Sequence, residues 1–315
     1  MKKKIIEGYR LNYIEAVKML SEYSDPELFA LANDLRAHFQ GKKMSTCMIM
    51  SAKSGNCSED CKWCAQSRFH NTGIPASPLT KYDKALKEAQ YAAAASLDMF
   101  GLVASGRRVS PSEVDQLASI YSKLSKAVPD IHLCASLGLL PKQDLQKLHE
   151  AGARRYHCNI ETAPSHFNKL CTTHTIEEKV ATIRAAQEVG MTICSGGIIG
   201  LGETMEQRIE MAIFLQTLQV NSIPINLLQP IANTPLEGTP PLSDSEILRT
   251  FALFRIINPQ ADIRFAAGRM RIKHIQPQAF KCGVSGALLG DMLTTIGSSI
   301  KEDFALFHKE GYHIK

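Results

Sequence analysis

The chain has 315 residues, of which 44% are hydrophobic and 21% charged, a composition typical of a globular protein that buries a large core. The net charge of +5 comes from basic residues spread along the chain, with a single short run at Lys2–Lys4, so a nucleic-acid partner is not indicated. The sequence lacks an apolar run of the ~20 residues that a membrane helix needs, and acidic residues interrupt the N-terminal region. We therefore expect a cytoplasmic protein with no membrane partner.

Residues 11–40 carry apolar residues at helical spacing and predict two leading helices. After them, short β-rich segments alternate with helical segments. The predicted strands cover residues 46–53, 98–104, 131–136, 155–160, 191–198, 222–228, 262–267 and 285–289. The predicted helices between them cover residues 82–96, 112–127, 142–152, 175–190, 205–218 and 243–257.

Eight strands alternating with helices predict an α/β fold, a (β/α)8 TIM-type barrel with an N-terminal helical extension. We expect residues 1–44 to form the extension and residues 45–315 the barrel domain. In such a barrel the chemistry gathers at the carboxyl ends of the strands and in the loops that follow them.

The nine cysteines are the most informative residues of the composition. Their odd number and the lack of a secretory signal argue against a disulfide framework. Clustered thiols in a reducing compartment indicate metal or redox chemistry instead.

Three of these cysteines, Cys57, Cys61 and Cys64, lie together in the segment SAKSGNCSEDCKWCAQS, directly after the first predicted strand. A structural zinc site needs a fourth ligand nearby, and the local candidate, His70, has poor spacing for it. Three thiolates can instead hold three irons of a [4Fe–4S] cluster and leave the fourth iron for an exogenous ligand. We therefore predict a catalytic cluster in the loop after strand 1.

The Cys-x3-Cys-x2-Cys spacing in a chain of barrel length resembles the radical S-adenosylmethionine (SAM) enzymes. The resemblance implies that SAM binds the open iron and that Trp63 borders its adenine. It also implies that an electron from the cluster cleaves SAM to methionine and a 5′-deoxyadenosyl radical, which removes hydrogen from an unactivated carbon.

Further segments narrow the resemblance to the biotin synthase family. These segments are YHCNIETAPSHF, ICSGGIIGLGET, SIPINLLQPIANTPL, RFAAGR and LLGDMLTTIG. The resemblance implies an enzyme that inserts sulfur into dethiobiotin, a reductant protein such as flavodoxin or ferredoxin, and a homodimer. Two alternatives stay open: a related barrel enzyme, similar to hydrogenase maturases or to the mutase methylornithine synthase, and a non-enzymatic metal-binding protein.

The resemblance also assigns roles at the strand ends. It implies that Asn159 and Glu161 contact the substrate and the ribose of SAM, and that Asn226 binds dethiobiotin. The alternative for all three is a strand-end side chain that bonds to the backbone. The run Ser195, Gly196 and Gly197 allows the backbone to approach the methionine end of SAM closely.

In this family a second iron–sulfur cluster donates the sulfur, held by cysteines on strands 2, 3 and 5 and by an arginine. Cys134, Cys194 and Arg269 match three of these positions, but Gly101 stands where the strand-2 cysteine is usual. Cys47 on strand 1 can replace it, because period-two alternation puts Cys47, Ile49 and Ser51 on one face. We expect an auxiliary cluster on Cys47, Cys134 and Cys194, with Arg269 as a ligand or a hydrogen-bonding partner.

The remaining cysteines are weaker candidates. Cys158 alternates against Asn159 and is expected to face the helices, Cys282 to lie outside the barrel, and Cys171 to be incidental. His157 and His174 stand where the family usually has an asparagine and an arginine. These departures indicate a divergent branch.

Overall fold

The structure is a computed structural model that describes residues 1–291, 293, 294 and 297–314. Met292, Thr295 and Ile296 belong to the segment LLGDMLTTIG, and that part of the resemblance lies outside the described residues.

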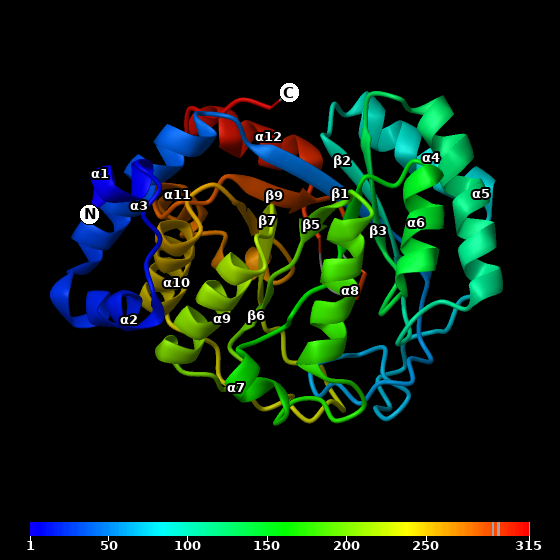
Figure 1. The fold of residues 1–315 in the computed structure, drawn as a ribbon, viewed down its shortest axis with the longest axis horizontal. Coiled ribbons are helices and arrows are strands. Elements are labelled where there is room, and N and C mark those ends of the chain that lie inside the picture. The colour runs from blue at the N-terminus through cyan, green and yellow to red at the C-terminus, as the bar shows by residue number, and fades with distance from the viewer. Residues whose placement is uncertain (292, 295–296, 315) are drawn as a thin grey trace.

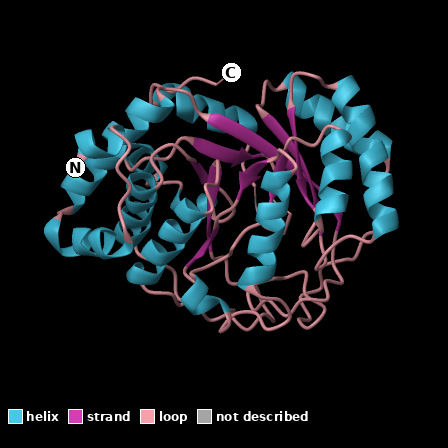
Figure 2. Ribbon diagram, viewed as in Figure 1, coloured by secondary structure: helices cyan, strands magenta, loops and turns pink. Residues whose placement is uncertain are grey.

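The strands form one parallel sheet that closes into a barrel (Figures 1 and 2). In chain order they are β1 (Ser45–Lys53), β2 (Met99–Ala104), β3 (His132–Ser136), β4 (Arg155–His157), β5 (Thr192–Cys194), β6 (Gly197–Ile199), β7 (Ser222–Leu227), β8 (Asp262–Phe265) and β9 (Gly286–Leu289). β5 and β6 are two halves of one strand, interrupted at Ser195 and Gly196, and the pairing of Cys194 with Ser222 closes the ring. The predicted eight-stranded (β/α)8 barrel is confirmed.

Helices cover the outside of the barrel between successive strands (Figure 2). They are α4 (Tyr82–Ala94), α5 (Pro111–Ala127), α6 (Lys142–Glu150), α7 (Pro164–Phe167), α8 (Ile176–Glu188), α9 (Met205–Thr217) and α10 (Asp244–Ile257). Four of these helices, α5, α8, α9 and α10, begin with a capping box, in which a Ser or Thr hydroxyl and a Glu or Gln three residues later satisfy each other's backbone amides. The six predicted helices are confirmed, and local sequence sets the starts of the four that carry a capping box.

The chain ends add further helices. Before the barrel come α1 (Lys2–Ile6), α2 (Tyr13–Glu22) and α3 (Asp25–Gln40), which lie beside α9 and α10 (Figure 1). After β8 come the 3-10 helix η1 (Arg269–Ile272), α11 (Gln276–Lys281) and, beyond β9, α12 (Ile300–Lys309). In the described part of the chain, each helix is too short or too polar to span a bilayer.

A buried carboxylate fixes β1 against β2 at the amino end of the barrel. Asp98 Oδ2 accepts hydrogen bonds from the backbone nitrogen and the hydroxyl of Thr46, at 2.8 and 2.9 Å, and Lys43 Nζ lies 2.8 Å from the other carboxylate oxygen. Burial opposes ionisation of Asp98, but these hydrogen bonds and Lys43 hold its pKa below the usual 3.8. The charged carboxylate therefore stabilises the folded chain.

We expect Asp98→Asn to lower the free energy of unfolding by about 2 kcal/mol at pH 7, because hydrogen bonds to a charged group are lost. The pKa of Asp98 is depressed in the folded chain, so its stabilising effect is present above the unfolded pKa and disappears as pH falls through the folded pKa. Denaturant titrations from pH 7 to pH 3 should show the two proteins converging below about pH 4. Asp34→Asn, at an exposed ion pair, is the control, and a difference independent of pH would contradict this role.

Candidate functional site

The cysteine loop, residues 54–67, leaves the carboxyl end of β1 and folds back on itself. Gly55 has a φ of +70°, and a Cβ there would lie 2.8 Å from Ala76 Cα, so this turn requires glycine. The amide of Cys57 donates to Gln66 O at 2.9 Å, and the amide of Cys64 donates to Cys61 O at 3.0 Å. These backbone bonds gather the three predicted cysteines in one short loop.

The three thiols interact with one another. Burial raises the pKa of Cys57, and burial together with the nearby Cys57 raises the pKa of Cys64 to about 11. A hydrogen bond to Cys171, burial and the charge of Cys64 raise the pKa of Cys61. The loop thus holds thiols whose protons a metal must displace. A cationic iron cluster would supply the positive charge that three neighbouring thiolates need. The donor set fits the predicted [4Fe–4S] cluster.

A second loop, residues 168–174, holds the cysteine loop in place, and we call it the clamp loop. The amide of Lys62 donates to Leu170 O at 3.0 Å. Asp60 Oδ1 accepts from the amide of Thr172 at 2.9 Å, and the amide of Asp60 donates to Thr173 Oγ1 at 3.1 Å. The position of the cysteines therefore depends on the loop between β4 and α8.

The structure places two further residues of this region, and one of them, Cys171, differs from expectation. Cys171, expected to be incidental, lies in the clamp loop with its Sγ 3.7 Å from Cys61 Sγ. His70, the local candidate for a zinc ligand, has its Nε2 3.1 Å from Cys61 O and so bonds to the backbone. The histidine thus shapes the loop and is not aimed at the thiols.

The predicted SAM-binding residues meet where β4 and the β5–β6 strand end. Asn159 Oδ1 accepts from the amide of Gly196 at 3.0 Å, and its Nδ2 lies 3.5 Å from Glu161 Oε2. Glu161 has a φ of +71°, unusual for a residue with a side chain, and the buried Lys179 Nζ lies 3.9 Å from its carboxylate. The Asn159 amide and the Glu161 carboxylate are thus held in fixed positions near the cysteine loop.

The glycines of the Ser195–Gly197 run are required by packing. A Cβ on Gly196 would lie 2.0 Å from Pro224 O, and one on Gly197 would lie 2.4 Å from Glu161 O. Ser195 is fully buried, and its hydroxyl has no hydrogen-bond partner among the described residues. A buried hydroxyl without a partner is costly, and it suits a site that a polar ligand completes.

Asn226 lies across from this run on β7. Its Nδ2 donates to Gly197 O and its Oδ1 accepts from the amide of Ala267, both at 3.0 Å. Both predicted asparagines thus bond to backbone here, as their alternative interpretation expects. A side-chain amide has two N–H groups and two acceptor lone pairs, so Asn226 keeps one of each for a ligand.

Two adjoining cavities lie on either side of Asn226. The outer one, of ≈ 110 Å³, is lined by Trp63, Ile198 and Leu228. The inner one, of ≈ 240 Å³, lies inside the barrel, and both cavities touch Asn226 and Ala267. Trp63 therefore stands at the outer cavity, and its role at the adenine stays a prediction.

The inner cavity gathers sulfur and cationic groups from five strands. These groups belong to Cys47, Cys134, Arg155, His157, Cys194 and Arg264. The structure thus brings together the three cysteines predicted for the auxiliary cluster, although their positions in the chain lie far apart.

Charges inside this cavity favour thiolates. A hydrogen bond from Cys134 and the charges of Arg264 and Arg155 lower the pKa of Cys47 to about 7, although burial opposes ionisation. Burial also opposes ionisation of Cys194, but its pKa is lowered by His157, whose Nδ1 lies 3.3 Å from the Cys194 Sγ. Cys134 keeps its proton, because its pKa is raised well above the ordinary value by the Cys47 thiolate and by burial. Thiolates next to cations suit an iron–sulfur cluster.

The expectation that Arg269 joins these thiols is not met. Arg269 lies in η1, beyond the end of β8, where its guanidinium bonds to Asp303 and Ser298 near α12. Arg264, within β8, takes the expected place at the cavity: its Nε donates to Ser222 Oγ at 2.6 Å and its Nη2 to Ser45 Oγ at 2.6 Å.

The glycine on β2 also faces this cavity. A Cβ on Gly101 would lie 3.4 Å from Cys134 Cβ and 3.5 Å from Ile49 Cγ2, which is ordinary contact. A side chain at this position would therefore stand beside Cys134, where the strand-2 cysteine is expected in the family.

Arg155, His157 and Arg264 are absent from the predicted ligand set, although the sequence holds a signal for the two residues on β4. If Asn159 faces the barrel interior, period-two alternation puts Arg155 and His157 on the same face. The other cysteines lie as expected: Cys158 packs in the core outside the barrel near Lys179, and Cys282 ends α11.

Comparisons with known proteins agree with this geometry. Residues 52–215 match the Radical SAM superfamily, and residues 224–313 match the Biotin and Thiamin Synthesis associated domain. The chain is 48% identical to the biotin synthase of Parabacteroides distasonis over 99% of this chain and 96% of that protein. It is 49% identical to the biotin synthase of Porphyromonas gingivalis over 99% of this chain and 94% of that protein.

Among solved structures, a crystal structure of methylornithine synthase superposes with a TM-score of 0.82, covering 100% of this chain and 97% of that chain. Its sequence is 20% identical, so this likeness concerns the fold alone.

We expect Asp60→Asn to loosen the cysteine loop, because a neutral amide replaces the carboxylate that binds the clamp loop. Losing about 1.4 kcal/mol of charge-assisted hydrogen bonding corresponds to about tenfold faster amide exchange. Hydrogen-exchange mass spectrometry of the peptide containing Lys62 and Cys64 measures it. Asp115→Asn, at an exposed ion pair with Lys147, is the control. Equal protection in the variant and the parent chain would show that the tether does not hold the loop.

Proposed function

The chain belongs to the biotin synthase family, radical SAM enzymes that insert sulfur into dethiobiotin to form biotin, and we propose how its residues share that work. The family carries a [4Fe–4S] cluster, SAM and an auxiliary iron–sulfur cluster. When bound, these groups supply a 5′-deoxyadenosyl radical, which removes hydrogen from dethiobiotin, and the sulfur that is inserted.

At the mouth of the barrel, Cys57, Cys61 and Cys64 hold the [4Fe–4S] cluster, and the fourth iron is left for SAM. Trp63 borders the adenine from the outer cavity. Glu161 accepts the ribose hydroxyls, since its carboxylate is fixed by an αL backbone and by Lys179. The backbone of Ser195, Gly196 and Gly197 lies against the methionine end of SAM.

Asn159 and Asn226 position the substrate between the two clusters. Each uses one hydrogen bond to hold the Ser195–Gly197 run, which fixes the orientation of its amide plane. The amide groups that remain can donate to and accept from the cyclic urea of dethiobiotin. Asn226 borders both cavities, so a substrate bound to it lies between the SAM site and the inner thiols.

Deep in the barrel, Cys47, Cys134 and Cys194 hold the auxiliary cluster, with Arg264 in place of Arg269 as a ligand or hydrogen-bonding partner. The observation that carries this proposal is the gathering of these three thiols with Arg264 in one cavity beneath the cysteine loop. His157 adds a nitrogen 3.3 Å from Cys194 and can donate to its sulfur.

We extend the proposal to organisation and partners. Residues 1–44 form an extension that covers α9 and α10, and residues 45–315 form the catalytic domain. A protein reductant such as flavodoxin or ferredoxin supplies electrons, and the enzyme acts as a cytoplasmic homodimer.

The function is tested by anaerobic reconstitution with iron and sulfide, followed by incubation with dethiobiotin, SAM and a reductant. We expect biotin by mass spectrometry, together with 5′-deoxyadenosine. Cys61→Ala should abolish both products, because one cluster ligand is missing. Cleavage of SAM without any biotin would reject sulfur insertion and favour another radical SAM reaction.

The auxiliary site is tested by the iron and sulfide content of the reconstituted protein. We expect Cys47→Ala to fall to the content of the SAM-binding cluster alone, because the inner cavity loses a thiolate that Cys134 and Cys194 cannot replace. Cys158→Ala, which removes a core-facing thiol, should leave the content unchanged. Unchanged content in Cys47→Ala would reject Cys47 as a ligand.

Gly101 offers a rescue of this variant. In the Cys47→Ala background, Gly101→Cys places a new thiol beside Cys134, where the Cβ contact of 3.4 Å leaves room for it. We expect at least part of the lost iron and sulfide to return. Failure of the rescue in a folded double variant would show that the two positions are not equivalent for the cluster.

A further inference from the structure

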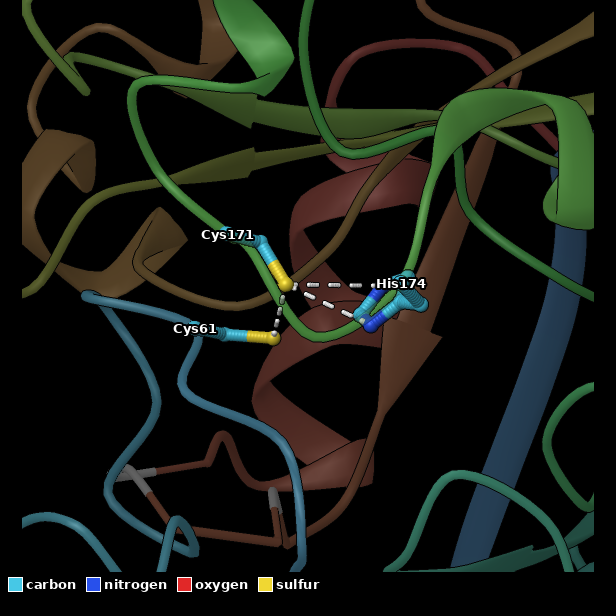
Figure 3. Close-up of side chains that lie close together, drawn as sticks. All are labelled: Cys61, Cys171 and His174. Atoms are coloured by element: carbon cyan, nitrogen blue, oxygen red, sulfur yellow. Dashed lines mark hydrogen bonds between the residues drawn. The ribbon is translucent and has the colours of Figure 1, made fainter.

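A second group of side chains of metal-ligand type lies where the cysteine loop meets the clamp loop. Only one of its members, Cys61, has been assigned a role above. It consists of Cys61 from the cysteine loop and of Cys171 and His174 from the clamp loop, which point toward one another (Figure 3). Their ligand atoms all lie within 4.8 Å of one another. Cys171 and His174 have no role in the proposed sulfur insertion.

The spacing of these atoms matches the edges of a tetrahedral metal site. The sulfurs of Cys61 and Cys171 are 3.7 Å apart, and the two ring nitrogens of His174 lie 3.3 and 3.9 Å from Cys171 Sγ. A tetrahedral zinc ion with Zn–S bonds of about 2.3 Å and Zn–N bonds of about 2.0 Å has S–S edges of about 3.8 Å and S–N edges of about 3.5 Å. Two thiolates and an imidazole are donors that Zn²⁺ and Fe²⁺ accept.

The surroundings of His174 are those of a metal-bound imidazole. Glu59 Oε2 lies 2.6 Å from His174 Nδ1, so the Nδ1–H can donate to the carboxylate, and Nε2, 3.9 Å from Cys171 Sγ, is left for a metal ion. Cys171, His174 and Glu59 are 2%, 7% and 5% exposed, so the rest of the protein fixes their positions. Arg107, whose Nη1 is 4.0 Å from Glu59, balances the charge of the carboxylate.

We propose that the cluster-free protein binds one divalent transition-metal ion, of the class of Zn²⁺ or Fe²⁺, at Cys61, Cys171 and His174. Binding releases to solvent the protons that the three ligand atoms carry, and a water completes the tetrahedron. Cys61 cannot serve this ion and the [4Fe–4S] cluster together, so the two exclude each other. The exclusion rests on the proposed role of Cys61 in the cluster, whereas the binding of the ion does not.

Co²⁺ is the probe for the site, because tetrahedral Co²⁺ with thiolate ligands has intense visible bands and sulfur-to-metal charge-transfer absorption. The titration uses the full chain without clusters, under anaerobic conditions, in a background with Cys47→Ser, Cys57→Ser, Cys64→Ser, Cys134→Ser and Cys194→Ser. This background removes the other thiols of both cluster sites. We expect about one equivalent of tetrahedral Co²⁺, which Zn²⁺ displaces.

Adding Cys171→Ser or His174→Gln to this background should weaken Co²⁺ binding at least tenfold, whereas Cys282→Ser, at a buried thiol elsewhere, should leave it unchanged. A folded background chain that binds no tetrahedral Co²⁺, or whose binding survives Cys171→Ser, would overturn the proposal. The zinc content of single variants of the otherwise unchanged chain gives an independent measurement. The Cys171→Ser protein should retain one fewer tightly bound Zn²⁺ than the Cys282→Ser control. Equal zinc contents in the two proteins would also overturn the proposal.

The exclusion has its own readout. Saturating the otherwise unchanged cluster-free chain with Zn²⁺ should slow formation of the [4Fe–4S] absorption during reconstitution, and Cys171→Ser should relieve this inhibition. Equal rates with and without Zn²⁺ would reject the competition. Because ion binding is measured without SAM, clusters or biotin formation, failure of the enzymatic assay and failure of this proposal remain distinguishable.

Discussion

The pairing of Cys194 in β5 with Ser222 in β7 closes the parallel strands into a ring, and both cluster sites depend on this closure. Because the strands run parallel, their carboxyl ends meet at one edge, where the cysteine loop, the clamp loop and the Ser195–Gly197 run converge. The same ring turns alternate side chains of each strand inward. Thiols and cations from distant parts of the chain therefore share the inner cavity.

The two sites differ in how they shift the pKa values of their thiols. In the cysteine loop, burial and neighbouring thiols raise the pKa values, so these residues carry their protons until iron arrives. In the inner cavity, a hydrogen bond from Cys134 and nearby cations lower the pKa of Cys47, and against the cost of burial His157 and the arginines lower that of Cys194. The pKa of Cys134 is raised, so this thiol keeps its proton. The protein thus supplies positive charge at the inner site itself, whereas under the proposed assignment the outer site would take its charge from the cluster.

The register of β1 and β2 bears on the proposed exchange of a thiol between neighbouring strands. β1 and β2 are paired with Ile49 opposite Gly101, and Cys47 lies one inward position below Ile49. A thiol on either strand can therefore reach the same cavity, from positions about two residues apart along the barrel axis. The clamp loop has a comparable effect at the mouth, where its hydrogen bonds to Asp60 and Lys62 decide which side chains surround Cys61.

Local patterns in the sequence were sufficient for the strands, the helices with their caps, the barrel and the loop of three cysteines, because periodicity and short-range spacing determine these features. Alternation along β4 could also have revealed that His157 faces the barrel interior. The pattern of one strand does not give its register against another strand, so it does not show which side chains lie at the same level of the barrel. The choice of Arg264 over Arg269 depended on where β8 ends and on the partners of Arg269 near α12. The meeting of Cys61 with Cys171 and His174 was decided by tertiary structure alone, because it depends on the docking of two loops more than 100 residues apart in the chain.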